Sequence, residues 1–411
     1  MPRAIYLSAG VVDEVGHYTN EARYFRDSFK SKGYDFLLVP HKTASETIKA
    51  EFEAIPLFSI EPEKMVSADP LIYWLESYDY IKYSYLNDLE QLPLINNEDI
   101  LIVASAEPTL IWAVSEWYKK RFHADNGPHV FYYVNLFSGM TPKYQDDEII
   151  NFDIYHQPQI LYRFAAKNID EIYSKKYHFI ASGKIHALAY SHLIAKKVTQ
   201  IPFTLRMDDM KKDEVLEESI NKSNIKIGFI GAQRPNKGFQ HVPFLLELLH
   251  NSYAHVSFVI QNSWRSMPEQ MQHIELLAQQ TDRIQIIDDN LSSAQWLALH
   301  KEIDFFILPY DQNFYATAAS GISIEAICLG TPQIAPKRTG ISQMLAHYGI
   351  SDSFFFEHSE PDTILETSKY AIEHFELLQE QTRIAHLAWH NENNSETLVS
   401  TIESMIHTPQ P

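Results

Sequence analysis

The stretch from Tyr310 to Pro332, YDQNFYATAASGISIEAICLGTP, places one carboxylate where it could do chemistry. Ser320 is a good N-cap and Gly330 a good C-terminal stop, so the pattern predicts a short helix between them. Glu325 is the one charged residue among the largely apolar residues of this helix, and a buried carboxylate needs hydrogen-bond donors. A sugar diol can supply two hydroxyl donors. A nearby Lys or Arg is the alternative partner.

The start of the same helix is a predicted anion site. The backbone N–H groups of Ser320, Gly321 and Ile322 have no partner within a helix, and with the helix dipole they attract negative charge. Gly321 also lacks the Cβ that would keep a phosphate away from the backbone. A diphosphate at the helix start and a ribose on Glu325 would describe a nucleotide-sugar site. The alternative is a helix of the hydrophobic core.

A second stretch with suitable chemistry runs from Gly228 to Gly238, GFIGAQRPNKG. Gly231 ends a predicted strand, and Arg234 and Lys237 lie three residues apart in the turn before the next helix. Arg can hold two phosphate oxygens at once, while Lys adds a point charge. Each such charge-assisted hydrogen bond contributes about 1.5–3 kcal/mol. This turn is therefore a candidate diphosphate clamp, and the alternative is a surface turn with two solvated cations.

A repeated alternation of strands and helices holds both stretches. It predicts strands at 225–230, 255–261, 283–287, 304–308 and 333–335, and helices at 239–249, 267–280, 292–301 and from 320. This alternation is typical of a doubly wound parallel sheet. Because Gly231 and Tyr310 each follow a strand, both stretches should open on the carboxyl edge of the sheet, where such folds bind ligands.

The first half of the chain predicts another sheet of the same kind. Its strands are expected at 4–9, 35–39, 100–105, 129–135 and 177–181, and its helices at 20–32, 108–122 and 182–197. The first strand leads through a loop with Gly16 and His17 into a helix, which is the place for a ligand in these folds. The loop lacks the GxGxxG pattern of dinucleotide sites. Asn135 ends a strand and belongs to the same predicted edge.

Length and composition point to a protein of two domains. The 411 residues suffice for two cores, and the net charge of −19 argues against nucleic acid or an anionic membrane as the main partner. The single cysteine, Cys328, excludes an intrachain disulfide and suits a reducing compartment. The start of the chain does not read as a signal peptide, and no apolar run is long enough to span a bilayer. We therefore expect a cytoplasmic protein without an integral membrane segment, which leaves peripheral membrane association open.

The same patterns predict domain boundaries. We expect an N-terminal Rossmann-like domain at 1–206, a charged linker at 207–224, a C-terminal Rossmann-like domain at 225–385 and a helical tail at 386–411, whose return to the N-terminal domain is left open.

The motifs GxxR, KG, PY and SGxxxEAxxxGxP, in this order, resemble the C-terminal domain of GT-B glycosyltransferases, particularly the retaining family-4-like group. The likeness covers about residues 225–340, and the N-terminal half is similar only in architecture. It implies two doubly wound domains facing across a cleft, with the acceptor on the first and the donor on the second. By this resemblance Arg234 and Lys237 hold the donor diphosphate and Glu325 holds the ribose. Gly231, Tyr310 and the amides of Ser320 to Ile322 would complete the donor site, with Gly16 reaching it from the first domain.

Two residues depart from the family's pattern. An acid eight residues before Glu325 would stand at position 317, where this chain has Thr317. A histidine often ends the strand before the cleft, where this chain has Asn135, which can bind a sugar hydroxyl but cannot carry a proton near neutral pH. His17, Asn135 and Thr317 are thus candidates for acceptor or sugar contacts.

The resemblance implies transfer of a hexosyl group from a nucleotide diphosphate sugar to an acceptor hydroxyl, with retention and without a metal. The acceptor would be a glycan, a lipid-linked sugar or a small molecule, as in polysaccharide biosynthesis. The alternative from another class is a non-catalytic subunit with GT-B shape that binds or chaperones within a glycosylation system. A sugar-nucleotide epimerase is a third alternative.

Overall fold

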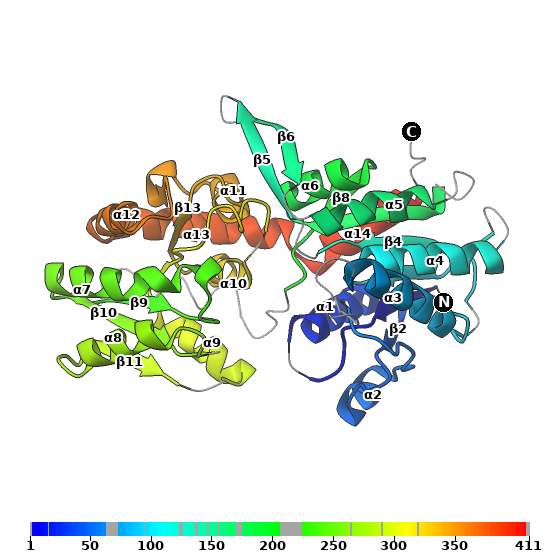
Figure 1. Ribbon diagram of the computed structural model, residues 1–411, viewed down its shortest axis with the longest axis horizontal. Helices are drawn as coiled ribbons and strands as arrows, with labels where there is room; N and C mark the ends of the chain where they lie inside the picture. Colours follow the sequence, from blue (N-terminus) through cyan, green and yellow to red (C-terminus); the bar gives the residue numbers. More distant parts are fainter. Residues whose placement is uncertain are drawn as a thin grey trace. The chain divides into compact units, whose positions relative to one another are not determined.

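The computed structural model divides the chain into two compact units, Met1–Arg206 with Asn393–Pro411, and Met207–Glu392. It describes residues 2–14, 16–62, 73–93, 95–122, 126–135, 139–145, 148–154, 157–169, 175–205, 224–263, 265–288, 291–318 and 320–407. The predicted linker at 207–224 lies outside the described residues except for its last residue. Each unit contains one six-stranded sheet (Figure 1).

The sheet of the first unit has the order β2-β1-β3-β4-β7-β8, and its strands pair in parallel. Its strands are β1 (Arg3–Ser8), β2 (Asp35–Pro40), β3 (Ile100–Val103), β4 (His129–Tyr133), β7 (Tyr177–Ser182) and β8 (Val198–Ile201). The chain moves from β1 outward to β2 and then returns to the other side of β1 for β3. The loops after β1 and β3 therefore diverge, and the crevice between them is where an open α/β sheet binds ligands.

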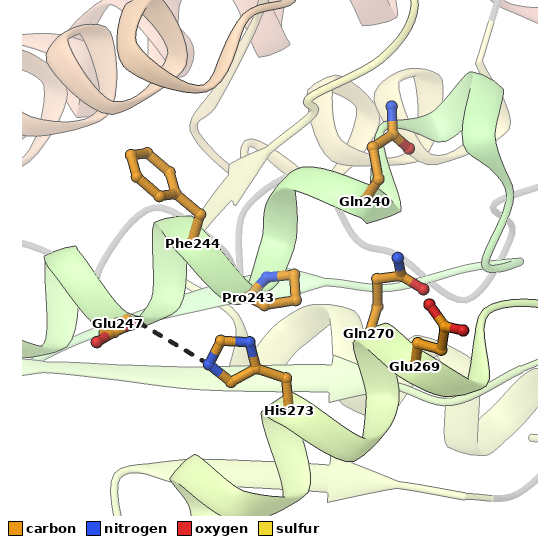
Figure 2. Close-up of a pocket in the computed structure, with 7 residues that line it drawn as sticks. All are labelled: Gln240, Pro243, Phe244, Glu247, Glu269, Gln270 and His273. Atoms are coloured by element: carbon orange, nitrogen blue, oxygen red, sulfur yellow. Dashed lines mark ion pairs between the residues drawn. The ribbon is translucent and has the colours of Figure 1, made fainter.

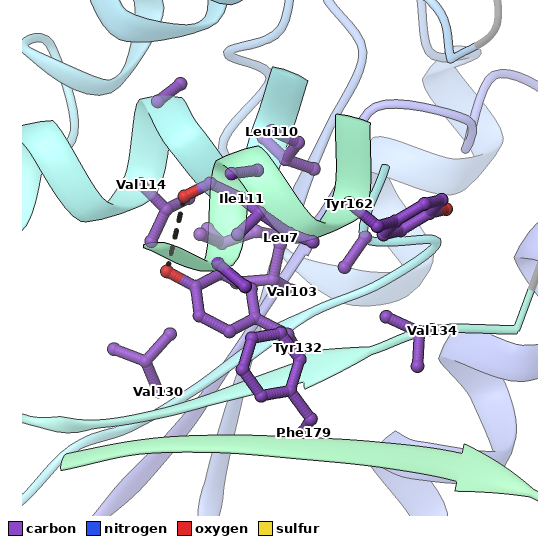
Figure 3. Close-up of a cluster of buried hydrophobic side chains, with 14 of the residues drawn as sticks. Leu7, Val103, Leu110, Ile111, Val114, Val130, Tyr132, Val134, Tyr162 and Phe179 are labelled. Carbon is purple, nitrogen blue, oxygen red and sulfur yellow. Dashed lines mark hydrogen bonds between the residues drawn. The ribbon is translucent and has the colours of Figure 1, made fainter. Parts of the chain in front are cut away.

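Helices cover both faces of this sheet. They are α1 (His17–Ser31), α2 (Glu46–Phe52), α3 (Tyr73–Leu89), α4 (Pro108–Arg121), α5 (Leu161–Lys167), α6 (Lys184–Ile194) and α14 (Ser395–His407), with a short turn η1 (Gln157–Ile160). One apolar cluster joins the sheet to α3, α4, α5 and α6, and the other joins it to α1, α2 and α14. Figure 3 shows part of the first cluster, where the Tyr132 hydroxyl donates to the Ile111 carbonyl at 3.4 Å.

The last helix returns to the first unit. Its N-cap is Asn394, whose side-chain oxygen accepts from the Thr397 N–H at 2.9 Å. The preceding Asn393 accepts from the Phe203 N–H at 2.9 Å, which fixes the entry of the chain. α14 packs on α1, with Ser28 and Ser395 in hydrogen-bond contact at 2.9 Å.

The sheet of the second unit has the order β11-β10-β9-β12-β13-β14, again with parallel pairs. Its strands are β9 (Ile225–Phe229), β10 (Val256–Gln261), β11 (Ile284–Ile287), β12 (Phe305–Ile307), β13 (Gln333–Pro336) and β14 (Phe355–Phe356). The chain goes from β9 outward to β11 and returns to the other side of β9 for β12. The corresponding crevice of this sheet lies between β9 and β12.

The helices of the second unit alternate with these strands. They are α7 (Val242–Ser252), α8 (Pro268–Ala278), α9 (Ser293–Glu302), α10 (Gly321–Leu329), α11 (Gly340–His347), α12 (Pro361–Glu373) and α13 (Phe375–Glu392), with the turns η3 (Pro235–Lys237), η4 (Phe239–His241) and η5 (Asp352–Phe354). α13 runs without a break through residue 386 and ends where the unit ends.

The predicted α/β class with two doubly wound sheets is confirmed. Among the local features that differ from the prediction are the start of the first helix and an antiparallel hairpin. The first helix begins at His17 rather than at residue 20, because Gly16 turns the chain at a φ of 111° directly before it. The antiparallel hairpin of β5 (Met140–Gln145) and β6 (Glu148–Ile154) stands apart from the parallel sheet and was not predicted from the sequence (Figure 1).

Candidate active site

The candidate site lies at the crevice of the second sheet. β9 and β12 are neighbours, with Gly228 in register with Phe306. The loop that follows β9 carries Gly231, and the loop that follows β12 carries Tyr310. Both loops therefore leave the carboxyl edge of the sheet side by side, as the sequence predicts.

Gly238 locks the two loops together. It has a φ of 67°, and a Cβ at this position would lie 1.6 Å from the carbonyl oxygen of Pro309. The Asp311 N–H donates to the Asn236 carbonyl at 2.9 Å. Only glycine permits both this backbone conformation and this close approach, so η3 has a fixed position against the loop after β12.

Gly231 brings the turn and the start of α10 together. It has a φ of 96°, and a Cβ there would lie 2.6 Å from Ile322 Cδ1 and 3.1 Å from Lys237 Nζ. Its N–H donates to Gln261 Oε1 at 2.8 Å, which ties the loop to the end of β10. The ammonium of Lys237 and the first turn of α10 therefore meet beside this glycine.

The environment of Lys237 favours an anion. Desolvation, which is the main cause, and the charge of Arg234 together lower the pKa of Lys237 to about 8, and Glu325 acts in the opposite direction. The ammonium also lies over the Tyr310 ring, 5.6 Å from its centroid. Two cations thus share a partly buried place, and a bound diphosphate would relieve both the desolvation and their mutual repulsion.

The N-terminus of α10 has an N-cap residue, and its first residue is accessible from outside the protein. Ser320 is the N-cap, and its Oγ accepts from the Ser323 N–H at 3.4 Å. Ser320 Oγ also lies 3.5 Å from the Tyr310 hydroxyl, whose pKa burial raises. Gly321 is exposed, and apart from Gly321 itself, its chain neighbours and the backbone of its own helix, no atom of the described residues lies within 4 Å of the place that a Cβ on Gly321 would take. An anion can therefore approach the helix start without hindrance from a side chain.

Glu325 is positioned by α9. The Trp296 Nε1 donates to Glu325 Oε2 at 2.9 Å, and His300 Nε2 lies 3.2 Å from the same oxygen. The side chain of His300 is 1% exposed and that of Glu325 is 21% exposed, so the carboxylate is held from the protein side and reached from the solvent side. Among the described residues, the hydrogen-bond donor to Glu325 is thus an indole, with an imidazole beside it, in place of the Lys or Arg of the alternative hypothesis.

The opposite end of α10 is fixed by two histidines of α13. His390 Nε2 lies 3.0 Å from the Cys328 carbonyl, and His386 Nδ1 lies 3.3 Å from the Ile327 carbonyl. Burial raises the pKa of the Cys328 thiol to about 12. Cys328 is therefore a packing residue, because a thiol at neutral pH is a poor nucleophile.

Thr317 stands where the resemblance would place an acid. It belongs to the loop that follows β12 and is 1% exposed, so it is buried. The neighbouring Tyr315 packs on Tyr310, with ring centroids 4.6 Å apart. Burial raises the pKa of Tyr315 to about 12, while the charge of Arg234 opposes the rise. The two tyrosine rings therefore form an apolar wall beside the cationic turn.

The remaining predicted residues lie in the first unit. Gly16 directly precedes α1, and His17 is the first residue of that helix, with its ring centroid 3.9 Å from that of Tyr18 and the two rings tilted by 40°. Asn135 follows β4, and its Nδ2 donates to Glu21 Oε1 at 2.6 Å. The structure thus separates the predicted residues into one group at the crevice of the second sheet and a smaller group at the carboxyl edge of the first sheet.

Sequence reasoning missed three residues. Trp296 and His300 lie four residues apart on the predicted helix at 292–301, and this spacing marks one helical face but not its target. Glu21 lies inside the first predicted helix and is buried. A charged residue at a core-facing position of that helix is a signal that could have been noticed.

Among the described residues, no group of three or more His, Cys, Asp or Glu side chains is arranged to hold a metal ion. No described helix is both long and apolar enough to cross a membrane. A groove between α7 and α8 is lined by Gln240, Pro243, Phe244, Glu247, Glu269, Gln270 and His273 (Figure 2). None of the predicted site residues lines this groove.

The sequence has no match among protein-family models or curated proteins. Solved structures, in contrast, match over nearly the whole chain. Sucrose-phosphate synthase from Thermosynechococcus elongatus has 12% identity and a TM-score of 0.62 with 98% of each chain covered. Trehalose-6-phosphate synthase OtsA has 9% identity and a TM-score of 0.64, with 99% of this chain and 100% of that chain covered.

A third solved structure that resembles this chain contains a bound nucleotide sugar. Anabaena HepE in complex with UDP-glucose has 11% identity and a TM-score of 0.59, with 98% of this chain and 99% of that chain covered. At these identities the likeness concerns the fold. The architecture that the three structures share with this chain is the GT-B fold.

Proposed function

We propose that this chain of GT-B fold is a glycosyltransferase that uses a nucleotide diphosphate sugar, of the retaining family-4-like kind. The second unit would bind the donor, and the first unit the acceptor. The transferred group would be a hexosyl group, and the acceptor a hydroxyl of a glycan, a lipid-linked sugar or a small molecule in polysaccharide biosynthesis.

One observation carries the proposal. A desolvated lysine, an unobstructed helix N-terminus and a carboxylate held from behind meet at the crevice of one sheet. Lys237, Arg234 and the amides of Gly321 and Ile322 match two linked phosphates, and Glu325 matches the vicinal hydroxyls of a ribose. The solved structures that resemble this chain support the same assignment, since one of them contains UDP-glucose.

The chemistry follows from where charge develops. The bond between the anomeric carbon and the diphosphate oxygen breaks, and its electron pair leaves with the diphosphate. A new bond forms from the acceptor oxygen to the anomeric carbon, and the acceptor proton passes to the leaving diphosphate. Lys237, Arg234 and the start of α10 would stabilise the negative charge on this leaving group, which lowers the barrier as well as the free energy of binding.

This proposal places the cations of the protein where a metal ion would otherwise neutralise the diphosphate. We therefore propose a metal-independent reaction. The low cysteine content and acidic charge agree with a cytoplasmic enzyme whose contact with membranes, if its acceptor is a lipid, is peripheral.

The test is a thermal-shift panel of uridine, guanosine and adenosine diphosphates and their sugars. At a ligand concentration of about 100 times Kd, binding stabilises the folded state by about 2.7 kcal/mol. We expect at least one nucleoside diphosphate to raise the melting temperature of the wild type and not that of Lys237→Ala. If no nucleoside diphosphate or nucleotide sugar shifts the melting temperature of the wild type, the proposed donor site is wrong.

A second candidate is a binding subunit without transferase activity. The buried Thr317 and the amide of Asn135, in place of an acid and a histidine, favour it. Incubating the protein with the nucleotide sugar that raises its melting temperature distinguishes these two candidates from each other and from an epimerase. An enzyme releases the nucleoside diphosphate from it by slow hydrolysis or by transfer, a binding subunit leaves it intact, and an epimerase changes the sugar while it stays attached.

A further inference from the structure

A row of polar side chains crosses three strand ends at the carboxyl edge of the second sheet. Gln233 lies in the turn after β9, Asn262 directly follows β10, and Asp288 directly follows β11. These three strands are consecutive neighbours in the sheet. Gln233 Nε2 donates to Asn262 Oδ1 at 2.7 Å, and Asn262 Nδ2 donates to Asp288 Oδ1 at 2.6 Å. We call these three hydrogen-bonded side chains the amide bridge.

The carboxylate of Asp288 sets the direction of the amide bridge. A carboxylate only accepts hydrogen bonds, so Asn262 has to present its NH₂ group to Asp288 and its oxygen to Gln233. Gln233 then has to donate, and its own oxygen is left over. Gln233 Oε1 is buried and has no hydrogen-bond partner within the described part of the chain. Because an unpaired buried oxygen costs stability, stability alone does not explain the bridge.

Backbone hydrogen bonds fix the same turn to the loop after β10. Gln233 N donates to the Ser263 carbonyl at 3.2 Å. Asn262 N donates to the Ile287 carbonyl at 2.8 Å, which fixes this loop to the end of β11. Gln233 and Asn262 are buried, whereas Asp288 is exposed. The turn after β9 is therefore held by two neighbouring strand ends, and Asp288 is the outer end of the bridge that holds it.

The turn that the amide bridge holds carries the two cations of the candidate site. Arg234 directly follows Gln233, and Lys237 lies three residues further on. The charge of Arg234 contributes to the low pKa of Lys237, so the two cations lie close enough to repel each other. A turn that was free to move would relax by separating them. The bridge opposes this movement because it holds the residue beside Arg234.

We infer that Asp288 is a positioning residue for the proposed diphosphate site. Through Asn262 and Gln233 it holds Arg234 and Lys237 in the arrangement that receives two linked phosphates, before any ligand binds. The inference rests on the proposed function, because it concerns how that site is kept in place. It gives a role to a carboxylate that neither the motifs nor the resemblance single out, and that acts through two amides.

A site that is already in place binds more tightly than one that the ligand has to order. Ordering the backbone of a single residue on binding lowers the affinity by about tenfold. Asp288→Ala removes the acceptor at the end of the bridge, so we expect it to weaken binding of a nucleoside diphosphate by about this factor. Inorganic pyrophosphate should lose the same factor, because only the phosphates contact the turn. Both affinities are measured by titration calorimetry on the full-length chain.

A pair of substitutions tests the direction of the amide bridge. Asn262→Asp places a second carboxylate against that of Asp288, and two acceptors cannot bond to each other. It should break the bridge and weaken binding of pyrophosphate at least tenfold. Adding Asp288→Asn supplies the missing donor, so the double variant should bind within about threefold of the wild type. Asp288→Asn alone should also stay within about threefold, because its amide oxygen still accepts.

Hydrogen exchange measures the turn without a ligand. In Asp288→Ala, the amides of residues 231–238 should exchange faster than in the wild type, because their turn has lost its support. The melting temperature should change little, since Asp288 is exposed. The matched control is Asp282→Ala, because Asp282 is also exposed and precedes β11 at the opposite end of that strand. The control should match the wild type in exchange and in binding.

The inference is overturned if Asp288→Ala binds pyrophosphate like the wild type, or if Asp288→Asn does not rescue Asn262→Asp. It is also overturned if Asp288→Ala weakens the nucleoside diphosphate alone, because Asp288 would then contact the nucleoside. Failure of the proposed function is seen in the wild type instead. A wild type that binds neither nucleoside diphosphates nor pyrophosphate overturns both, whereas variants that bind like a wild type with affinity overturn only the role of Asp288.

Discussion

Replacing Lys237 by methionine should stabilise the free protein and abolish binding of the nucleoside diphosphate. The pKa of Lys237 is about 8 in the folded chain against an ordinary 10.5, and desolvation is the main cause. This difference corresponds to a cost of about 3 kcal/mol in the folded state at neutral pH. Methionine keeps most of the apolar stem and removes the charge, so Lys237→Met should gain up to that amount.

The pH dependence has a definite sign. Because the folded pKa lies below the unfolded one, the cost is fully present below about pH 8 and disappears as the pH rises toward 10.5. The advantage of Lys237→Met over the wild type should therefore be largest at pH 7 and vanish near pH 10.5. In the wild type, affinity for a nucleoside diphosphate should fall above about pH 8, where the ammonium of the free protein loses its proton.

The assay is thermal and chemical unfolding with and without the nucleoside diphosphate. For a unit of this size, 1 kcal/mol shifts Tm by about 2–4 °C, so the gain at pH 7 would be at most about 6–12 °C. Lys226→Met is the matched control, since Lys226 lies near the amino end of β9 and pairs with Glu302 at 3.4 Å. It should change neither stability nor binding appreciably. A less stable Lys237→Met that still binds the diphosphate would refute the reasoning.

The other predictions concern the ribose contact, the first unit and the helix start. Glu325→Gln should weaken binding of a nucleoside diphosphate more than that of pyrophosphate. Trp296→Phe should do the same by about fivefold, because the indole N–H orients the carboxylate. If calorimetry shows equal losses for both ligands, the assignment of Glu325 to the ribose is wrong. Glu21→Gln should gain stability over the wild type by roughly 3–4 kcal/mol between pH 5 and pH 8 in urea unfolding, because a pKa raised from 4.5 to about 8 makes the wild type lose stability in that window. Parallel pH profiles of the two proteins would contradict this. Gly321→Ala should keep the wild-type Tm yet bind diphosphate at least tenfold more weakly, because its Cβ would take space that we assign to the ligand. Gly238→Ala should instead lose stability, because its Cβ would clash with the loop after β12. A Gly321→Ala variant that binds diphosphate normally would exclude the helix start as the anion site.

Local signals in the sequence suffice for the arrangement of the two sheets. Short apolar runs alternate with helical patterns, and the glycine-rich turns fall at the strand ends. The position of the candidate donor site follows from this, because Gly231 and Tyr310 each come directly after a strand. The hairpin β5–β6 has no such signal, since its strands are half exposed and one contains Pro142.

The contacts that shape the site are beyond local reasoning. Glu325 meets Trp296 across 29 positions of sequence, and nothing in either segment names the other. The need for glycine at position 238 likewise comes from the carbonyl of Pro309, a neighbour only in the folded chain. Glu21 and Asn135 are 114 residues apart, so a buried carboxyl shared with an amide becomes visible only when α1 lies on its sheet. Local sequence patterns predict where the helices and strands lie, whereas tertiary packing determines which side chains come into contact.

The most direct measurement for the whole account is a crystal structure of the chain soaked with the nucleoside diphosphate that raises its Tm most. The account predicts the two phosphates at the N-terminus of α10, within hydrogen-bond distance of the Gly321 N–H and of Lys237, with the ribose hydroxyls on Glu325. A ligand bound in the groove between α7 and α8, or a diphosphate away from α10, would contradict it.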